Sequence, residues 1–333
     1  MSNHIPQPAA QEGPRPKPGK ARKASKPVTF PPESDQLPSP VVDNHTHFPD
    51  QGDDAVELPE GVETLPVDVQ IERAERAGIV GIIHSGCEYP GLEHAVQLAR
   101  DWRPIAAAIA IHPNEAPRHA GVIETAPDGW VQELADHHRE VSLDDAIAKV
   151  AELATANPEH VVAIGETGMD LFRTAAVGLE QQRRSFRDHI ALAKELGLPL
   201  QIHNREANRE VVETLLDDGA PERTVFHCFT GDAEFAGILN EHGWFASFAG
   251  PITFKANKDL RRACAAMSRD HVLVETDAPY LTPAPYRGRP NASYVMTHTV
   301  RVVAEQMGME LTQACQTILA NTRRVYGDWF TAA

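Results

Sequence analysis

The sequence contains two histidines, His45 and His47, that are separated by a single residue and follow the apolar pair Val41–Val42. This pattern is typical of a short buried strand that leads into a loop. Because side chains alternate between the two faces of a strand, the two imidazoles should point into the same space. Two neutral imidazoles that converge in this way can supply half of a metal site. Two ordinary loop histidines are the alternative, so the remaining ligands must be sought elsewhere in the chain.

Four further side chains that can bind a metal each follow a short apolar run far away in the sequence. They are Glu166, His203, His227 and Asp277. Buried strand ends normally carry apolar residues, because an isolated polar group is costly there. Any one of the four could be a satisfied core residue, but together with His45 and His47 they indicate one site.

The types of these side chains suit a pair of divalent ions. Nitrogen and oxygen donors without thiolate allow zinc, manganese, cobalt or magnesium, and the histidine content disfavours magnesium alone. Glu166 can bridge two ions with its two oxygens. In the predicted division, one ion is held by His45, His47 and Asp277 and the other by His203 and His227. Such a pair would lower the pKa of a bridging water and give hydroxide at neutral pH.

The elements that must position these residues follow from the hydrophobic pattern. Short apolar runs alternate with helical patterns along the chain. The expected strands begin at Val41, Ile79, Ile105, Val161, Leu198, Thr224, Trp244 and His271. This alternation predicts an α/β protein folded as a (β/α)8 TIM barrel, with the metal site at the C-terminal mouth of the strands. An open doubly wound sheet is the alternative, and the regular count of strands argues against it.

The domain organisation is expected to be simple. Residues 1–40 are rich in Pro, Ala, Gln, Lys and Arg and should form a disordered basic arm, while residues 41–333 form the barrel domain. The basic patch at 15–26 could tether a polyanion, and a solvated tail is the simpler alternative. Residues 114–158 are expected to be a long insertion with polar helices across 126–156.

Composition limits the classes of partner. The formal net charge of −16 argues against tight binding along a duplex, because an acidic surface gains little from counterion release. It leaves room for nucleic acid bound locally at a metal-bearing cleft. The four cysteines form no CxxC pair and indicate free thiols in a cytoplasmic protein. No apolar run is long enough for a membrane helix, so no membrane partner is expected.

Several motifs around the predicted ligands resemble the TatD family of metal-dependent deoxyribonucleases, within the amidohydrolase superfamily. The resemblance covers residues 41–330 and is carried by DNHTH at 43–47, GETGMD at 165–170, LPLQIHNR at 198–205, FHCFTG at 226–231, FAGPITF at 248–254 and ETDAPYL at 275–281. It implies the barrel, the two metal ions and a metal-dependent hydrolase that cleaves a phosphodiester bond. Glu166 and Asp277 are then the predicted catalytic residues, because Asp277 could also take a proton from the attacking water.

The expected substrate is DNA, without an organic cofactor. Arg205 and Arg173 could bind phosphate, since a guanidinium can contact it with two hydrogen bonds, and His112 would line the mouth. The alternative for each arginine is an ion pair with a loop carboxylate. A site at the mouth of a barrel suits a strand end or a frayed single strand, so we expect exonuclease-like cleavage by the metal-bridged hydroxide.

Two other functions remain open from the sequence. The same ligands could serve an amidohydrolase-type enzyme that cleaves an ester, a lactone or an amide. A non-enzymatic metal-bearing scaffold is the third possibility, against which the complete ligand set argues. The chain also has Leu171–Phe172 where the family usually has an aromatic pair, and Tyr286 where it has a histidine. These departures concern the rim of the cleft, and therefore the substrate rather than the metal chemistry.

Overall fold

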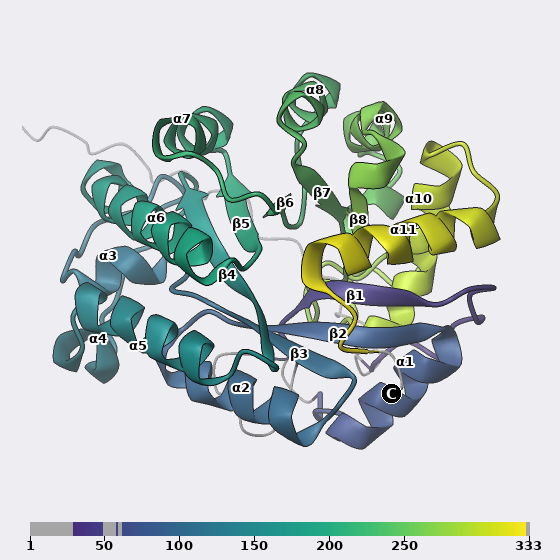
Figure 1. The fold of residues 1–333 in the computed structure, drawn as a ribbon, viewed down its shortest axis with the longest axis horizontal. Coiled ribbons are helices and arrows are strands. Elements are labelled where there is room, and N and C mark those ends of the chain that lie inside the picture. Colours follow the sequence, from purple (N-terminus) through teal and green to yellow (C-terminus); the bar gives the residue numbers. More distant parts are fainter. Residues whose placement is uncertain (1–28, 49–57, 59–61, 331–333) are drawn as a thin grey trace, which may run out of the picture.

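The computed structural model describes residues 29–48, 58 and 62–330, whose strands form one parallel eight-stranded sheet in the order β1 to β8. The strands are β1 Val41–Thr46, β2 Ile79–Gly86, β3 Ile105–Ile109, β4 Val161–Asp170, β5 Leu200–Arg205, β6 Thr224–Phe226, β7 Phe245–Phe248 and β8 Val272–Val274. Each strand pairs in parallel with the next one along the chain. Figure 1 shows the strands at the centre and the helices around them, which confirms the predicted (β/α)8 barrel.

Hydrogen bonds between the two ends of the sheet bring the barrel close to closure. The Asn44 side chain donates to the carbonyl of Val274 over 2.8 Å. The backbone N–H of Asp277 donates to the carbonyl of His45 over 3.0 Å. The segment after β8 therefore lies against the end of β1, and two of the predicted metal ligands are joined through the backbone.

The helices cover the outside of the sheet. They are α1 Val67–Ala77, α2 Leu92–Asp101, α3 Glu115–His119, α4 Asp136–Glu140, α5 Leu143–Ala156, α6 Ala176–Leu196, α7 Asn208–Asp218, α8 Ala233–His242, α9 Lys258–Ala266, α10 Thr297–Gln306 and α11 Leu311–Tyr326. The long helix α6 ends at Gly197, which has a φ of 64° and donates its N–H back to the last turn. No helix in these described ranges is long and apolar enough to cross a membrane.

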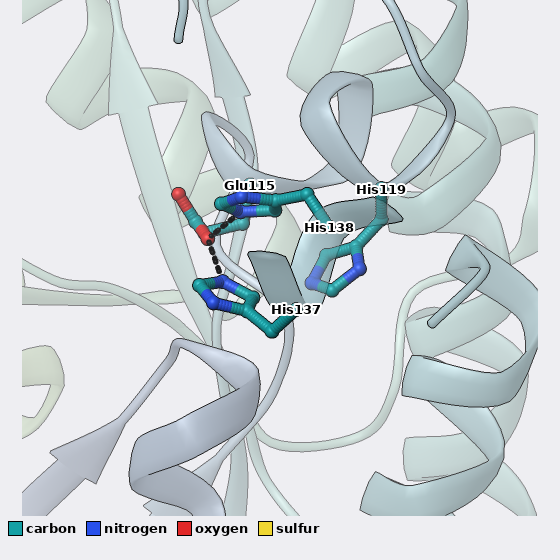
Figure 2. A group of neighbouring side chains, drawn as sticks. All are labelled: Glu115, His119, His137 and His138. Carbon is teal, nitrogen blue, oxygen red and sulfur yellow. Dashed lines mark hydrogen bonds and ion pairs between the residues drawn. The ribbon is translucent and has the colours of Figure 1, made fainter. Parts of the chain in front are cut away.

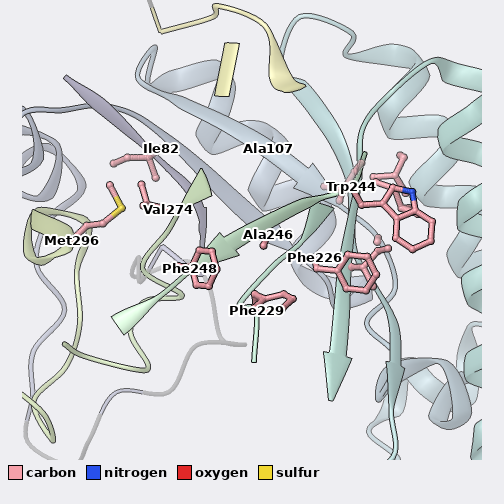
Figure 3. Close-up of a cluster of buried hydrophobic side chains, with 14 of the residues drawn as sticks. Ile82, Ala107, Phe226, Phe229, Trp244, Ala246, Phe248, Val274 and Met296 are labelled. Atoms are coloured by element: carbon pink, nitrogen blue, oxygen red, sulfur yellow. The ribbon is translucent and has the colours of Figure 1, made fainter. Parts of the chain in front are cut away.

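The main core lies between the sheet and the helices and fixes the strand ends that lead to the mouth. Figure 3 shows Phe226, Trp244 and Phe248 within this cluster. The Phe226 ring lies 5.8 Å from the Trp244 ring and 5.5 Å from the Phe235 ring of α8, between their centroids. Because Phe226 is anchored in this way, the next residue, His227, emerges at a fixed point at the end of β6.

The prediction of a disordered arm is wrong for its last twelve residues, because residues 29–40 pack on the barrel. Leu37 is buried, with only 4% of its surface exposed, and its N–H donates to the carbonyl of Ala77. The Tyr294 hydroxyl donates to the carbonyl of Pro31 over 2.6 Å, and Glu33 forms an ion pair with Arg76. The folded domain therefore includes residues 29–40. The basic patch and the rest of the predicted arm lie outside the described residues.

Two further features at the mouth of the barrel differ from the prediction. Strand β4 continues past Glu166 to Asp170, because it pairs with β5 as far as Asp170 and Arg205. The insertion after β3 is less helical than expected: between α3 and α4 it contains turns and a single antiparallel bridge from Thr125 to Val131. Both differences lie at the mouth of the barrel, where they bring additional side chains to the predicted site.

Candidate metal centre

The carboxylate of Glu166 lies at the middle of the predicted ligand set. Its Oε1 is 3.2 Å from Nε2 of His47, and its Oε2 is 3.1 Å from Nδ1 of His203 and 2.5 Å from Nε2 of His227. The side chain of Glu166 is only 4% exposed. Histidines from β5 and from just beyond β1 and β6 thus meet around one buried carboxylate on β4.

His45 and Asp277 complete the group on the side of β1 and β8. Nε2 of His45 is 3.9 Å from both Glu166 Oε1 and Asp277 Oδ1, and Nε2 of His47 is 3.6 Å from the same Asp277 oxygen. Nε2 of His45 is fully buried and has no hydrogen-bond partner among the described residues. A buried nitrogen lone pair that faces two carboxylates without a proton to share fits a bound cation.

Gln201 fixes the tautomer and the orientation of His45. The amide NH₂ of Gln201 donates to the carbonyl of Asn44 and to the hydroxyl of Tyr326, which leaves its Oε1 as the acceptor. Nδ1 of His45 lies 3.0 Å from this oxygen and must therefore carry the proton. The lone pair of His45 is then on Nε2, the nitrogen that faces Glu166 and Asp277, as metal-binding histidines require.

Two other carboxylates hold the loop that carries Asp277. Asp43, the first residue of the histidine motif, accepts hydrogen bonds from the N–H and the hydroxyl of Thr276, at 2.8 and 2.6 Å. Glu275 accepts the N–H of Cys228 and lies 3.5 Å from Nδ1 of His227. Burial raises the pKa of Asp43 to about 7. These residues position the ligands and do not face the mouth themselves.

The pKa values of Glu166 and the histidines around it show that positive charge is favoured at the middle of this ligand set. Burial alone would raise the pKa of Glu166, but the facing His227 and His112 and the hydrogen bond from His203 hold it well below its ordinary value. Burial opposes a proton on His47, yet the contact with Glu166 raises its pKa to about 9. The pKa of His227 is raised by the same carboxylate. A divalent cation would supply the charge that these protons otherwise provide.

Asp170 is a functional candidate that the sequence-based ligand set omits. Its Oδ2 is 3.1 Å from Nε2 of His203 and accepts the side-chain amide of Asn114 at 3.2 Å. Its pKa is lowered to about 2, because the hydrogen bond from His203 outweighs the effect of burial. The alternation of side chains along a strand could have identified Asp170. In a strand that continues to residue 170, Glu166 and Asp170 point to the same face.

The structure brings all six predicted ligands together, but their grouping differs from the predicted division between two ions. Close sets of one donor atom per residue are formed by His45, His47 and Glu166, by His45, His227 and Asp277, and by His112, Glu166 and His203. His227 thus groups with His45 and Asp277. The rings of His45 and His227 are stacked, with their centroids 4.0 Å apart. His112, expected to contact substrate, lies 3.8 Å from Oε1 of Glu166. The division of ligands between ions stays a prediction.

A cavity of about 910 Å³ opens above these residues and is lined by both predicted phosphate-binding arginines. Arg205 lies over the ring of Phe172, with its guanidinium carbon 3.9 Å from the ring centroid. Arg173 forms an ion pair with Asp128 at 3.3 Å and lies 5.6 Å from the centroid of Trp130. Arg173 thus makes the loop ion pair considered as its alternative role, whereas Arg205 stacks on an aromatic ring.

Comparison with known proteins gives consistent results. A profile of the family described as TatD related DNase matches residues 42–327. The chain is 34% identical over 291 residues to a Mycobacterium tuberculosis protein named an uncharacterized metal-dependent hydrolase TatD, covering 86% of this chain and 98% of that protein. It is 29% identical over 263 residues to a Pectobacterium parmentieri protein named a 3'-5' ssDNA/RNA exonuclease TatD, covering 76% of this chain and 90% of that protein.

A solved structure supports the fold. The crystal structure of a TatD homologue from Escherichia coli matches with a TM-score of 0.70 and 24% sequence identity, covering 86% of this chain and 98% of that one. At this level of identity the likeness concerns the barrel alone.

Proposed function

This chain belongs to the TatD family of metal-dependent hydrolases, and we propose that it cleaves phosphodiester bonds at the ends of DNA strands. The observation that carries the proposal is the buried Glu166 carboxylate, which is surrounded by imidazoles at the mouth of the barrel. Barrel enzymes carry out their chemistry at this mouth. The name of the Pectobacterium relative supports a nucleic-acid substrate and attack from a strand end.

The residues proposed to hold two divalent ions are His45, His47, Glu166, His203, His227 and Asp277. Their donor set suits zinc, manganese, cobalt or magnesium. When bound, such ions lower the pKa of a water molecule and offset the charge of the phosphate. The unpartnered Nε2 of His45 and the raised pKa of His47 support a cation at this point.

Asp277 is proposed as the proton acceptor. Its side chain is 14% exposed, so it reaches both the buried histidines and the open cavity. A carboxylate in this position can take a proton from a water that attacks phosphorus. Glu166 keeps the imidazoles oriented toward the same space, so its role is to fix the geometry in which that water and the phosphate meet.

The aromatic and basic residues at the rim suit a single strand. Arg205 and Arg173 can contact phosphate oxygens, and His112 lines the floor next to Glu166. Trp130, which also lines the cavity, offers a ring surface on which a base can stack. The net charge of −16 agrees with binding confined to the cleft. A cytoplasmic location stays part of this proposal.

A second candidate function is hydrolysis of an ester, lactone or amide by the same centre. It is favoured by the ion pair of Arg173 with Asp128, which reduces the positive charge available to a phosphate. A metal-bearing scaffold without enzymatic activity is the third alternative, and the open cavity above the ligands argues against it.

The experiment that separates these functions is digestion by metal-free protein reloaded with one metal at a time. End-labelled single-stranded and double-stranded DNA and RNA are incubated in parallel with a panel of esters, lactones and amides. The proposal expects shortening of single-stranded DNA from one end, and the Asp277→Asn variant serves as the matched control. Turnover of an amide or ester without any shortening of DNA would support the second candidate, and turnover of nothing would support the scaffold.

A further inference from the structure

A second group of metal-binding side chains lies in the insertion between β3 and β4. Glu115 and His119 are four residues apart on α3 and so share one face of the helix. His137 and His138 come from α4. One donor atom of each residue lies within 4.8 Å of those of the other three. Figure 2 shows the Glu115 carboxylate facing His137 and His138, with His119 beside them.

The hydrogen bond of His119 leaves a free lone pair inside this group. Nδ1 of His119 lies 2.9 Å from the carbonyl of Val141, so this nitrogen carries the proton and donates it. Nε2 is therefore the unprotonated nitrogen. It is buried and has no hydrogen-bond partner in the described part of the chain, and His119 as a whole is 4% exposed. A backbone carbonyl that fixes one ring nitrogen while the other is free is the usual arrangement of a metal-binding histidine.

His138 has the opposite arrangement and so serves a different purpose. Its Nδ1 accepts the N–H of Ala135 at 3.0 Å, which requires the proton to be on Nε2. Nε2 then donates to Oε2 of Glu115 over 2.7 Å. His138 therefore has no lone pair to offer a metal in this tautomer. It holds the carboxylate of Glu115 in place, together with Arg118, which pairs with Oε1.

His137 supplies the third donor. Nε2 of His137 is 3.7 Å from Oε2 of Glu115, which is beyond hydrogen-bond distance. This nitrogen atom is buried and has no hydrogen-bond partner among the residues described. A purely structural network of hydrogen bonds would be expected to use the ring nitrogens of both His119 and His137. Instead both Nε2 atoms are left without a hydrogen-bond partner among the described residues, in a group whose donor atoms lie within 4.8 Å of one another.

We propose that Glu115, His119 and His137 form a zinc site separate from the centre around Glu166, with His138 as a positioning residue. Two imidazole nitrogens and one carboxylate oxygen are a ligand set that zinc favours, with a fourth position left for water. The protonation states agree. His138 and Arg118 hold the pKa of Glu115 down to about 2 against the effect of burial, and burial lowers the pKa of His119 and His137.

The zinc would join α3 to α4 and thereby fasten one rim of the mouth. Asn114, next to Glu115, donates to Asp170, which in turn contacts His203. The segment between the two helices carries Trp130, which lines the cavity. The site therefore acts on the mouth by fixing the segment that borders it, and not by contact with the reacting bond.

The test is the zinc content of purified holoprotein, measured by mass spectrometry of the metal. His119→Gln and His137→Gln should each hold roughly one zinc per chain less than the parent protein. His160→Gln, which changes a histidine outside both groups, should hold the parental amount. Hydrolysis of a short substrate should persist in all three variants, because none of these residues belongs to the centre around Glu166.

Cobalt(II) gives a second readout that is independent of activity. In a His47→Ala/His203→Ala background, which weakens the main centre, metal-free protein should still bind cobalt with the visible absorption of a tetrahedral ion, and adding His137→Gln should abolish it. His137 is 23% exposed, so this variant should fold even if His119→Gln does not. Equal zinc content in the parent, His119→Gln and His137→Gln, or cobalt absorption that survives His137→Gln, would overturn the proposal.

Discussion

Replacement of Gln201 by leucine should weaken metal binding without removing any metal ligand. Gln201 is fully buried and makes three hydrogen bonds, to Nδ1 of His45, to the carbonyl of Asn44 and to the hydroxyl of Tyr326. Leucine has nearly the same volume and none of these polar atoms. His45 could then move its proton to Nε2, the nitrogen needed for the metal, or turn its ring.

The size of the effect follows from these contacts. Loss of a residue that orients a metal-binding histidine typically lowers metal affinity about 10–100-fold, which is roughly 1.4–2.7 kcal/mol. Leaving buried polar partners unpaired costs about 1–3 kcal/mol for each group that finds no other partner. If two of the three groups find no other partner, the metal-free protein should also lose roughly 2–6 kcal/mol of its free energy of unfolding.

The assay separates these two effects with a matched control. Tyr326→Phe removes one hydrogen bond from the same amide but leaves the contact between Gln201 and His45 unchanged. Metal affinity is measured by competition with a chelating dye, and stability by urea unfolding of metal-free protein. We expect weaker metal binding only in Gln201→Leu and reduced stability in both variants. Parental metal affinity in Gln201→Leu, with reduced stability, would refute the idea that Gln201 sets the orientation of His45.

Three other predictions follow from the site and its surroundings. Asp277→Asn should lower kcat about 10²-fold or more with little change in substrate affinity, and a variant that keeps its metals and its parental rate would exclude Asp277 as the base. A chain that starts at Thr29 should keep the melting temperature of the full chain, whereas one that starts at Pro40 should lose roughly 5–10 °C, because the contacts of 29–40 are removed. The pKa of Glu115 is lowered to about 2, so the ionised carboxylate stabilises the folded protein. This contribution to the free energy of unfolding is complete above the ordinary pKa of 4.5 and is lost as the pH falls toward 2. Acid titration of metal-free protein should show this loss, and Glu115→Gln should show a smaller one.

The barrel and the six proposed ligands were predictable because each signal is local and periodic. A strand that carries His45 and leads directly into His47 should direct both rings to one side, and parallel strands in a barrel must bring their C-terminal ends to one mouth. The same reasoning reached Glu166, His203 and His227, although their distances to one another required the structure.

The features that the sequence did not reveal depend on contacts between distant segments. Residues 29–40 contain few apolar side chains, and they are held by backbone hydrogen bonds and by the burial of Leu37, which composition does not report. Asp170 was missed because β4 was expected to end at Glu166. The pairing of α3 with α4 brings His119 and His137 together across a segment without regular periodicity, so only the structure could show it.

The most direct test of the central claim is the metal content of Glu166→Ala, measured on the same samples as hydrolysis of single-stranded DNA. Glu166 contacts His47 through Oε1, and His203 and His227 through Oε2. Its loss should therefore affect every ion held at this centre. We predict that the variant binds roughly one or two ions per chain fewer than the parent and loses nearly all hydrolysis, while the zinc proposed at His119 remains. A variant with the parental metal content and the parental rate would contradict the assignment of Glu166 as the residue around which the metal centre is built.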